Sequence, residues 1–131
     1  MSRLTKFPNG LSGYLVDDQA IAKESNYTII VNDDSGKTFT TETDGQVFTL
    51  PSIVIGNTIT IVNMAEDGAA GVSVSPAALD SIIYIGSAVD NKDLINTKAT
   101  AKRGDYVVLS SKGSASGWQV ADVRGIWAIE A

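Results

Sequence analysis

The sequence contains neither cysteine nor histidine, and these two absences exclude much familiar chemistry. Without them there is no Ser-His-Asp or Cys-His nucleophile, no zinc finger, and no haem or iron–sulfur centre held by histidine or thiolate ligands. Only carboxylate, lysine, tyrosine and serine side chains remain for catalysis. The lack of cysteine leaves the redox compartment open, and a chain of 131 residues is long enough to fold without disulfides or metal.

Basic residues and long apolar runs are also scarce. Ten Lys and Arg stand against 15 Asp and Glu, a net charge of −5, and this balance argues against a nucleic-acid partner. No apolar run approaches the ~20 residues of a membrane-spanning helix. The opening residues 1–10 lack the apolar stretch of a signal peptide. We therefore expect neither a nucleic-acid nor a membrane partner, and synthesis in the cytoplasm.

What the sequence does contain is a series of short runs rich in Val, Ile, Thr and aromatic residues, separated by turn residues such as Asp, Asn and Gly. The segment 58–62 alternates Thr and Ile, which is typical of a strand with one buried and one wet face. We expect strands over Tyr27–Val31, Lys37–Thr41, Gln46–Leu50, Thr58–Val62, Gly71–Ser75, Ser81–Ile85, Thr97–Thr100, Asp105–Leu109, Trp118–Ala121 and Ile126–Ile129.

This spacing predicts an all-β fold, either a sandwich or a barrel. The alternation within the strands is typical of antiparallel sheets, and we expect an antiparallel β-sandwich. Residues 1–26 show no clear period and are expected to form an extended N-terminal arm, followed by one β-sandwich domain over residues 27–131. No repeat of fixed length is evident, which argues against a solenoid or a propeller.

Acidic side chains in two turns are candidate ligands for a hard cation: Asp33 and Asp34 before Gly36, and Glu66 and Asp67 before Gly68. Neither turn has the spacing of a calcium-binding loop, and solvated turns are the favoured interpretation. A glycosidase-like carboxylate pair needs a defined geometry, which the number of acids does not supply. No phosphate-binding motif occurs. We expect no catalytic residues, no metal and no cofactor, hence no enzyme.

Trp118 and Trp127 are the two tryptophans, and both lie in strand-like runs near the C-terminal end of the sequence. Each is a candidate anchor for an interface or for a sugar ring. Core packing is the favoured interpretation, because buried aromatic side chains remove a large apolar area from water.

Two sets of segments resemble known proteins. The opening MSRLTKFPNG resembles the "RLTxFPNG" start of many structural head proteins of tailed bacteriophages. The later order GNTITIVN (56–63), VSVSP (72–76), GDYVVL (104–109) and GWQV (117–120) to GIW (125–127) is similar to small β domains of phage head-decoration proteins and fibres. The opening motif is the more specific of the two.

The resemblance implies a capsid decoration protein, also called a cement or head-stabilising protein, with a jelly-roll-like sandwich. Such a protein binds the outside of the capsid and bridges neighbouring major capsid protein subunits. It implies a place on the virion surface after synthesis in the host cytoplasm, and a homo-oligomer, either a dimer or a trimer. No catalytic residues are implied.

On this interpretation the arm orders on the shell or on a neighbouring subunit through Arg3, Leu4, Phe7 and Pro8. Packing of the arm on its own domain is the alternative. Two other classes of protein also stay open: a phage fibre or receptor-binding head domain, and a carbohydrate-binding β-sandwich module.

Overall fold

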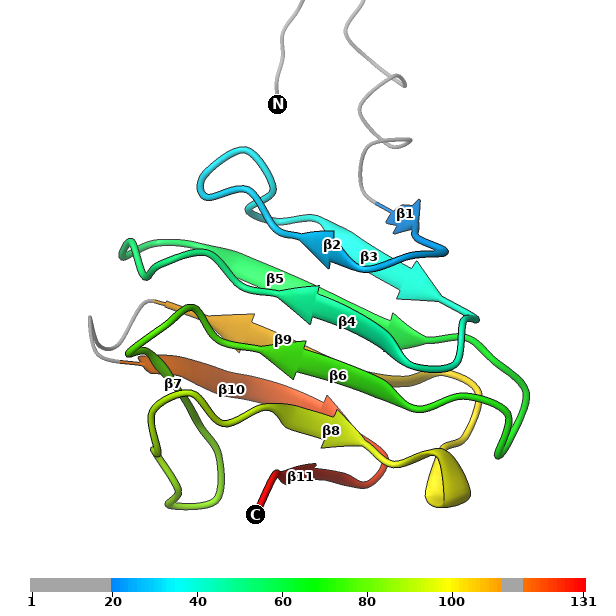
Figure 1. Ribbon diagram of the computed structural model, residues 1–131. Coiled ribbons are helices and arrows are strands. Elements are labelled where there is room, and N and C mark those ends of the chain that lie inside the picture. Colours follow the sequence, from blue (N-terminus) through cyan, green and yellow to red (C-terminus); the bar gives the residue numbers. More distant parts are fainter. Residues whose placement is uncertain (1–19, 112–116) are drawn as a thin grey trace, which may run out of the picture.

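The computed structural model describes residues 20–111 and 117–131. These residues form eleven strands, a single turn of 3-10 helix and no α-helix, so the prediction of an all-β protein is confirmed. The strands make two sheets that lie face to face, without closing into a barrel (Figure 1). One sheet has six strands in the order β1-β3-β5-β9-β10-β7, and the other has five in the order β11-β8-β6-β4-β2.

The strands are β1 (Ala20–Ala22), β2 (Tyr27–Thr28), β3 (Thr38–Thr41), β4 (Gln46–Thr49), β5 (Thr58–Asn63), β6 (Val72–Ser75), β7 (Ser81–Ile83), β8 (Leu94–Asn96), β9 (Asp105–Ser110), β10 (Gly117–Arg124) and β11 (Trp127–Ile129).

From β1 to β6 the chain passes alternately through the two sheets, so that successive strands within one sheet point the same way. The pairs β1/β3, β3/β5, β2/β4 and β4/β6 are therefore parallel, and β7 joins β10 in parallel as well. The other four pairs are antiparallel. Both sheets are mixed. The prediction of an antiparallel sandwich is wrong for the five parallel pairs. A jelly-roll connectivity is not confirmed.

The sequence pattern does not distinguish parallel from antiparallel strand pairs, for a physical reason. Alternation of apolar and polar residues reports which face of a strand is buried, and it is the same beside a parallel or an antiparallel neighbour. As the chain winds back and forth between the two sheets, the number of residues in each turn of its path also varies. Ala20 pairs with Thr38, 18 positions away, whereas Gln46 pairs with Val72, 26 positions away. No repeat could therefore be seen in the sequence.

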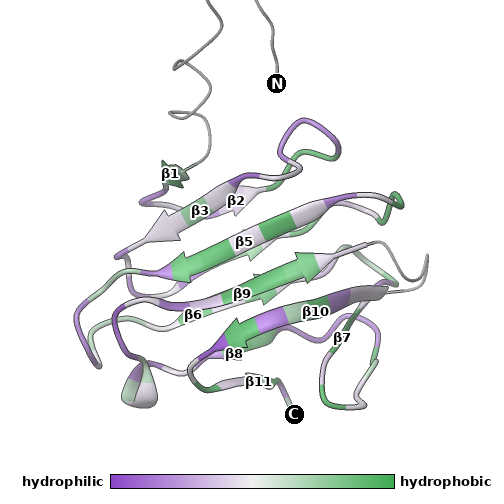
Figure 2. Ribbon diagram, turned by 180° about the vertical axis from the view of Figure 1, so that it is seen from behind, coloured by the Kyte–Doolittle hydropathy of each residue, from purple (hydrophilic) through white to green (hydrophobic). Residues whose placement is uncertain are grey.

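The apolar core lies between the two sheets. Strand β5 shows how it is built, because Ile59 and Ile61 point inward and are buried while Thr58 and Thr60 face outward. Figure 2 shows the same alternation along β5. Each large apolar side chain buried in this way contributes roughly 1.5–3 kcal/mol. The other large buried side chains include Phe39, Phe48, Val72, Val74, Leu94, Val107, Leu109 and Trp118.

Buried polar side chains close one end of this core. Asn63 donates from Nδ2 to Asn96 Oδ1 at 2.8 Å, and Asn96 Nδ2 donates to Asp105 Oδ2 at 3.1 Å. At the same end of the core, Thr41 Oγ1 donates to Gln46 Oε1 at 3.3 Å. Such groups are tolerated in a core because each has found a partner.

One predicted strand is wrong. Residues Lys98–Thr100 form a turn of 3-10 helix, and the strand of this region is β8, which ends at Asn96 just before the helix. The chain turns here because Asn96 is fixed by its buried hydrogen bonds and the next strand, β9, belongs to the other sheet.

Strand β1, at the edge of the six-stranded sheet, belongs to the segment expected to be an arm. Ala20–Ala22 pair in parallel with Thr38–Thr40. Residues 1–19 lie outside the described residues.

Candidate functional site

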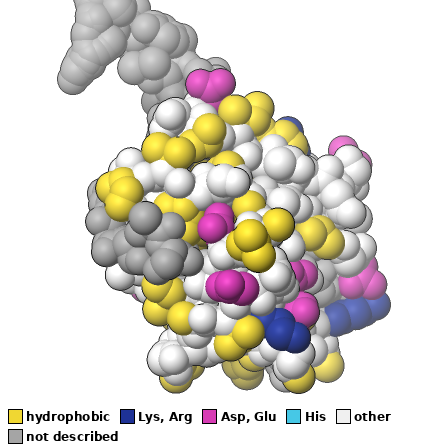
Figure 3. All heavy atoms as spheres, turned by 60° about the vertical axis from the view of Figure 1, so that its left-hand side comes forward, with side chains coloured by type: hydrophobic (Ala, Val, Ile, Leu, Met, Phe, Trp, Pro, Cys, Tyr) yellow, Lys and Arg dark blue, Asp and Glu magenta, His cyan; other side chains and the backbone are white. Residues whose placement is uncertain are grey.

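Exposed hydrophobic side chains gather on one side of the molecule. Among the described residues, six of the eight large hydrophobic side chains that are exposed lie in the connections on the left-hand side of Figure 1: β2–β3, β4–β5, β6–β7 and β7–β8. The sixth, Ile85, lines a separate groove beside β11 and is described below. We call the other five side chains the loop face: Ile30, Val54, Ile55, Leu79 and Val89. Figure 3 brings this side forward and shows hydrophobic side chains spread over it with acidic ones among them.

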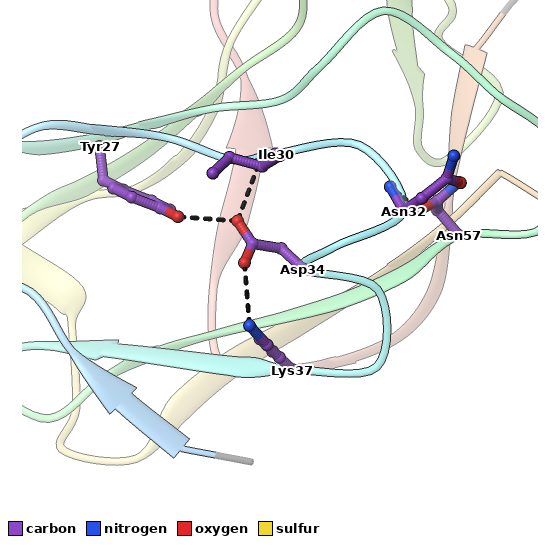
Figure 4. A network of polar contacts seen from close by, with 6 residues as sticks. All are labelled: Tyr27, Ile30, Asn32, Asp34, Lys37 and Asn57. Carbon is purple, nitrogen blue, oxygen red and sulfur yellow. Dashed lines mark hydrogen bonds and ion pairs between the residues drawn. The ribbon is translucent and has the colours of Figure 1, made fainter. Parts of the chain in front are cut away.

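A buried aspartate holds the first of these loops. Asp34 Oδ2 accepts hydrogen bonds from the Tyr27 hydroxyl at 2.7 Å and from the Ile30 amide at 2.8 Å (Figure 4). Its other oxygen, Oδ1, lies 3.3 Å from the Lys37 ammonium. Every oxygen of this carboxylate is thus engaged, and the backbone that carries Ile30 is fixed.

The pKa values of this cluster reflect the same contacts. Burial by itself raises the pKa of Asp34, but the hydrogen bonds from Ile30, Tyr27 and Lys37 and the charge of Lys37 outweigh it and lower that pKa below its ordinary value. Burial, together with the hydrogen bond to Asp34 and its negative charge, raises the pKa of Tyr27 to about 12. Asp34 is therefore charged and Tyr27 neutral at physiological pH, which is the state that their hydrogen bond requires.

A second polar cluster ties the next loop to the first. Asn57 Nδ2 donates to the Val54 carbonyl at 2.9 Å and to Asn32 Oδ1 at 3.2 Å, while Asn57 Oδ1 accepts from the Asn32 amide at 2.9 Å. The Ser111 hydroxyl donates to the same Val54 carbonyl at 2.7 Å. Asn32 has a positive φ of 65°, which asparagine tolerates better than most residues.

The connections around Leu79 are held in a similar way. Asp80 accepts the Ile53 amide at 3.2 Å through its side chain and the Asn91 amide at 2.9 Å through its carbonyl. Asn91 Oδ1 in turn accepts the Leu79 amide at 2.8 Å. Leu79 is 76% exposed and has φ of 70°, a conformation that leucine rarely adopts. Hydrogen bonds thus hold the backbone at three residues of the loop face: Ile30, Val54 and Leu79.

The opposite side of the molecule has a different character. Its connections carry exposed charged side chains, and Lys98 pairs with Asp44 at 2.9 Å and Lys102 with Asp67 at 3.7 Å. Among the described residues, Met64 and Ile126 are the only exposed large hydrophobic residues there. The two ends of the sandwich therefore offer different surfaces to a partner, and the loop face is the one with more exposed apolar surface to bury.

The predicted site residues fall into two groups. Arg3, Leu4, Phe7 and Pro8 lie outside the described residues. Trp118 in β10 is fully buried and Trp127 in β11 is 4% exposed, so both pack in the core. Trp127 Nε1 donates to the Arg124 carbonyl at 3.0 Å, whereas Trp118 Nε1 is buried without a partner among the described residues. Neither ring offers a face to a sugar.

The two acidic turns considered as cation ligands have other partners. Both carboxylate oxygens of Asp34 contact Tyr27, Ile30 or Lys37. Asp67 Oδ1 accepts a hydrogen bond from the Arg103 amide at 2.9 Å. Across residues 20–111 and 117–131, no three or more Asp or Glu side chains come together in a group able to hold a metal ion. In the same residues no helix is long and apolar enough to cross a membrane.

Sequence reasoning did not find the loop face. Four of its five residues lie between the expected strands, and Ile30 lies within the expected strand Tyr27–Val31, which in the structure ends at Thr28. The available signal was the presence of Val54-Ile55 and Leu79 inside turn-rich segments, where solvated residues are usual. That the loops bearing these residues meet on one side depends on the alternation of the chain between the sheets, which the sequence does not display.

Comparison with known proteins adds no relative. No protein-family model matches the chain. No curated protein matches it either.

Proposed function

We propose that this protein is a non-enzymatic virion component that binds the outer surface of a tailed-bacteriophage capsid and stabilises it by bridging major capsid protein subunits. The loop face is the observation that carries the proposal, because it presents five hydrophobic side chains, three of them on backbone held by hydrogen bonds. A surface fixed before binding loses little conformational entropy when it docks. The resemblance of residues 1–10 to phage head proteins supplies the class of partner.

The proposal requires two stacked sheets with loops at one end, not a jelly-roll connectivity. It places the loop face against the shell and gives the arm, with Arg3, Leu4, Phe7 and Pro8, a second contact. Several modest contacts repeated over many copies add up to strong attachment. A protein that binds the assembled, expanded shell stabilises that state by mass action.

The decisive experiment is co-sedimentation with expanded capsids. Deleting residues 1–13 should leave a folded domain that no longer occupies the capsid, since one of its contacts is gone. Ile55→Asp should also lower occupancy, because it places a charge at the contact. The matched control is Met64→Asp at the opposite, charged end, which should leave occupancy unchanged. Full occupancy by both the deletion and Ile55→Asp would refute the proposal.

The fibre and carbohydrate-binding alternatives receive no specific support from Trp118 or Trp127, because both rings are buried. Electron microscopy of labelled particles separates the alternatives. Label distributed over the capsid surface supports decoration, and label confined to the tail or its fibres contradicts it.

A further inference from the structure

A groove lies at the edge of the sandwich that is farthest from β1. It is a hollow of about 350 Å³ between Tyr84, Ile85 and Ser87 of the β7–β8 connection and residues 127–130 of β11 and its end. Tyr84 and Ile129 are partly buried hydrophobic residues packed against the core. The lining is therefore largely apolar and rests on rigid structure.

Ile85 is the most unusual residue of this groove. Its side chain is 84% exposed, and its φ is 49°, in the left-handed region where a β-branched residue is strained. The turn is fixed by paired hydrogen bonds, in which the Tyr84 amide donates to the Ser87 carbonyl and the Ser87 amide to the Tyr84 carbonyl, each at 3.0 Å. An isoleucine here costs free energy in both strain and exposure, so its placement points to a binding role.

The groove lies beside free strand edges. Strand β11 is the outermost strand of the five-stranded sheet, with β8 as its neighbour. Strand β7 pairs only with residues Gly117–Gln119 of β10, so the second half of β10 has no strand on that side among the described residues. An extended segment can add to such an edge through main-chain hydrogen bonds.

The rim of the groove is acidic, because Glu130 lines it and Asp93 lies close to Glu130. Burial raises the pKa of Asp93, and the nearby charge of Glu130 raises it further, against a hydrogen bond from Ser75. None of the ion pairs among the described residues includes Asp93 or Glu130. Lys92, the adjacent base, donates to the Ala131 carbonyl at 2.8 Å. A partner that brings a positive charge would relieve this repulsion.

The chain itself contains a segment with the matching chemistry. Residues 1–10 hold Arg3 and Lys6 and no acidic residue, with the apolar Leu4 and Phe7 set between and beside them. A segment of this kind can place apolar side chains in the groove and a base on the acidic rim. Residues 8–19 span up to about 40 Å when extended, which is ample to carry the segment across a contact between two copies.

We propose that the segment Arg3–Pro8 of one copy docks in the groove between Ile85 and β11 of a neighbouring copy. β1, the strand that follows residues 1–19, and β7, beside the groove, are the two edge strands of the six-stranded sheet. Two copies placed head to tail bring the arm of one next to the groove of the other. Contacts of this kind close into rings when the rotation permits, as a symmetric shell requires. The inference deepens the proposed function by naming the place where the arm binds.

The experiment is photocrosslinking of the full chain in free solution, without capsids. A benzophenone analogue of phenylalanine is placed at position 7, and the protein is mixed with isotopically labelled unmodified copies at up to about 1 mM, a concentration typical of short tethers. We expect crosslinks between copies that map to residues 84–87 or 127–130. Crosslinks only within one copy, crosslinks between copies at other surfaces, or no crosslinks at all would overturn the inference.

A matched pair of variants sharpens the test. Ile85→Asn removes the apolar side chain but keeps a residue that accepts φ of 49°, so the protein stays folded while crosslinking falls at least about tenfold. Leu79→Asn makes the same change at the other exposed residue of this type, outside the groove, and should leave crosslinking intact. Equal effects of the two variants would contradict the proposed site.

A charge exchange tests the rim. Lys6→Glu should weaken crosslinking, and adding Glu130→Lys should restore it. Because no capsid is present, failure of these experiments leaves shell binding by the loop face untouched. Conversely, loss of capsid binding in Leu79→Asn alone would not bear on the groove.

Discussion

At the scale of single residues, buried polar side chains fix particular loops of this protein. Asp34 is the clearest case, because one carboxylate fixes Tyr27, Ile30 and Lys37 at once. In the sequence the same side chain is one of several acids in a turn, a pattern that favours a solvated carboxylate. What the sequence could not show is the loop that bends back over Tyr27 and excludes water from the carboxylate.

Replacing Asp34 by asparagine tests this role through pH. The folded protein holds the pKa of Asp34 below its unfolded value near 3.9, so its charge stabilises the fold above that pH. This contribution disappears as the pH falls through the lower, folded pKa. At pH 7 we expect Asp34→Asn to lower the free energy of unfolding by about 1–3 kcal/mol. The difference should shrink below about pH 4. Urea unfolding across this range measures it, and a difference independent of pH would contradict the assignment.

Gly125 is required for a different reason. It has φ of 95°, and a Cβ there would overlap the carboxylate of Asp105, which is buried and accepts hydrogen bonds from Asn96 and the Lys102 amide. We expect Gly125→Ala to cost about 3 kcal/mol, from strain and overpacking together.

Gly36→Ala is the control for that prediction. Its φ is 84°, but a Cβ would meet open space, so only the backbone strain of about 1–2 kcal/mol applies. Thermal or urea unfolding of the two variants should separate them, and equal losses would show that the contact with Asp105 does not matter.

At the scale of elements, the sequence predicted strand faces far better than strand partners. The Thr and Ile alternation of β5 correctly gives the buried face. Its neighbours β3 and β9, one parallel and one antiparallel, could not be deduced from it. The error at Thr97–Thr100 has a similar origin, since these residues are acceptable in a strand but lie where the chain must pass from one sheet to the other.

The face assignment of β5 can be tested with adjacent residues. Ile61 is fully buried, and Ile61→Ala should cost about 2–5 kcal/mol through lost apolar burial and the remaining cavity. Thr60 faces outward, and Thr60→Ala should change stability by less than about 1 kcal/mol. Denaturant unfolding of both variants checks this, and comparable losses would contradict the assigned faces.

At the scale of the whole molecule, the alternation between sheets decides which strands pair and which connections lie on the same side. It makes most strand pairs distant in sequence, as in the pairing of Thr58 in β5 with Ser110 in β9. Closing such long loops costs conformational entropy before the contacts between the paired strands contribute any favourable free energy. The same alternation places four connections on one side and so creates the loop face.

This topology predicts slow folding. We expect folding in milliseconds to seconds, in the range of proteins dominated by non-local pairs. Both tryptophans are buried, so stopped-flow fluorescence after dilution from denaturant reports the reaction directly. If the whole change in fluorescence were complete within microseconds, it would contradict the slow folding expected from this topology.

The sequence by itself determined that histidine and cysteine chemistry is absent, that the fold is all-β, and which residues of a strand such as β5 face the core. These properties follow from composition and from a period of two, both of which are local. Only the tertiary structure decided that the sheets are mixed, that Trp118 and Trp127 are buried, and that Ile30, Val54, Ile55, Leu79 and Val89 lie on one side. Partner choice and loop clustering arise from contacts between segments far apart in the chain, and no local pattern records them.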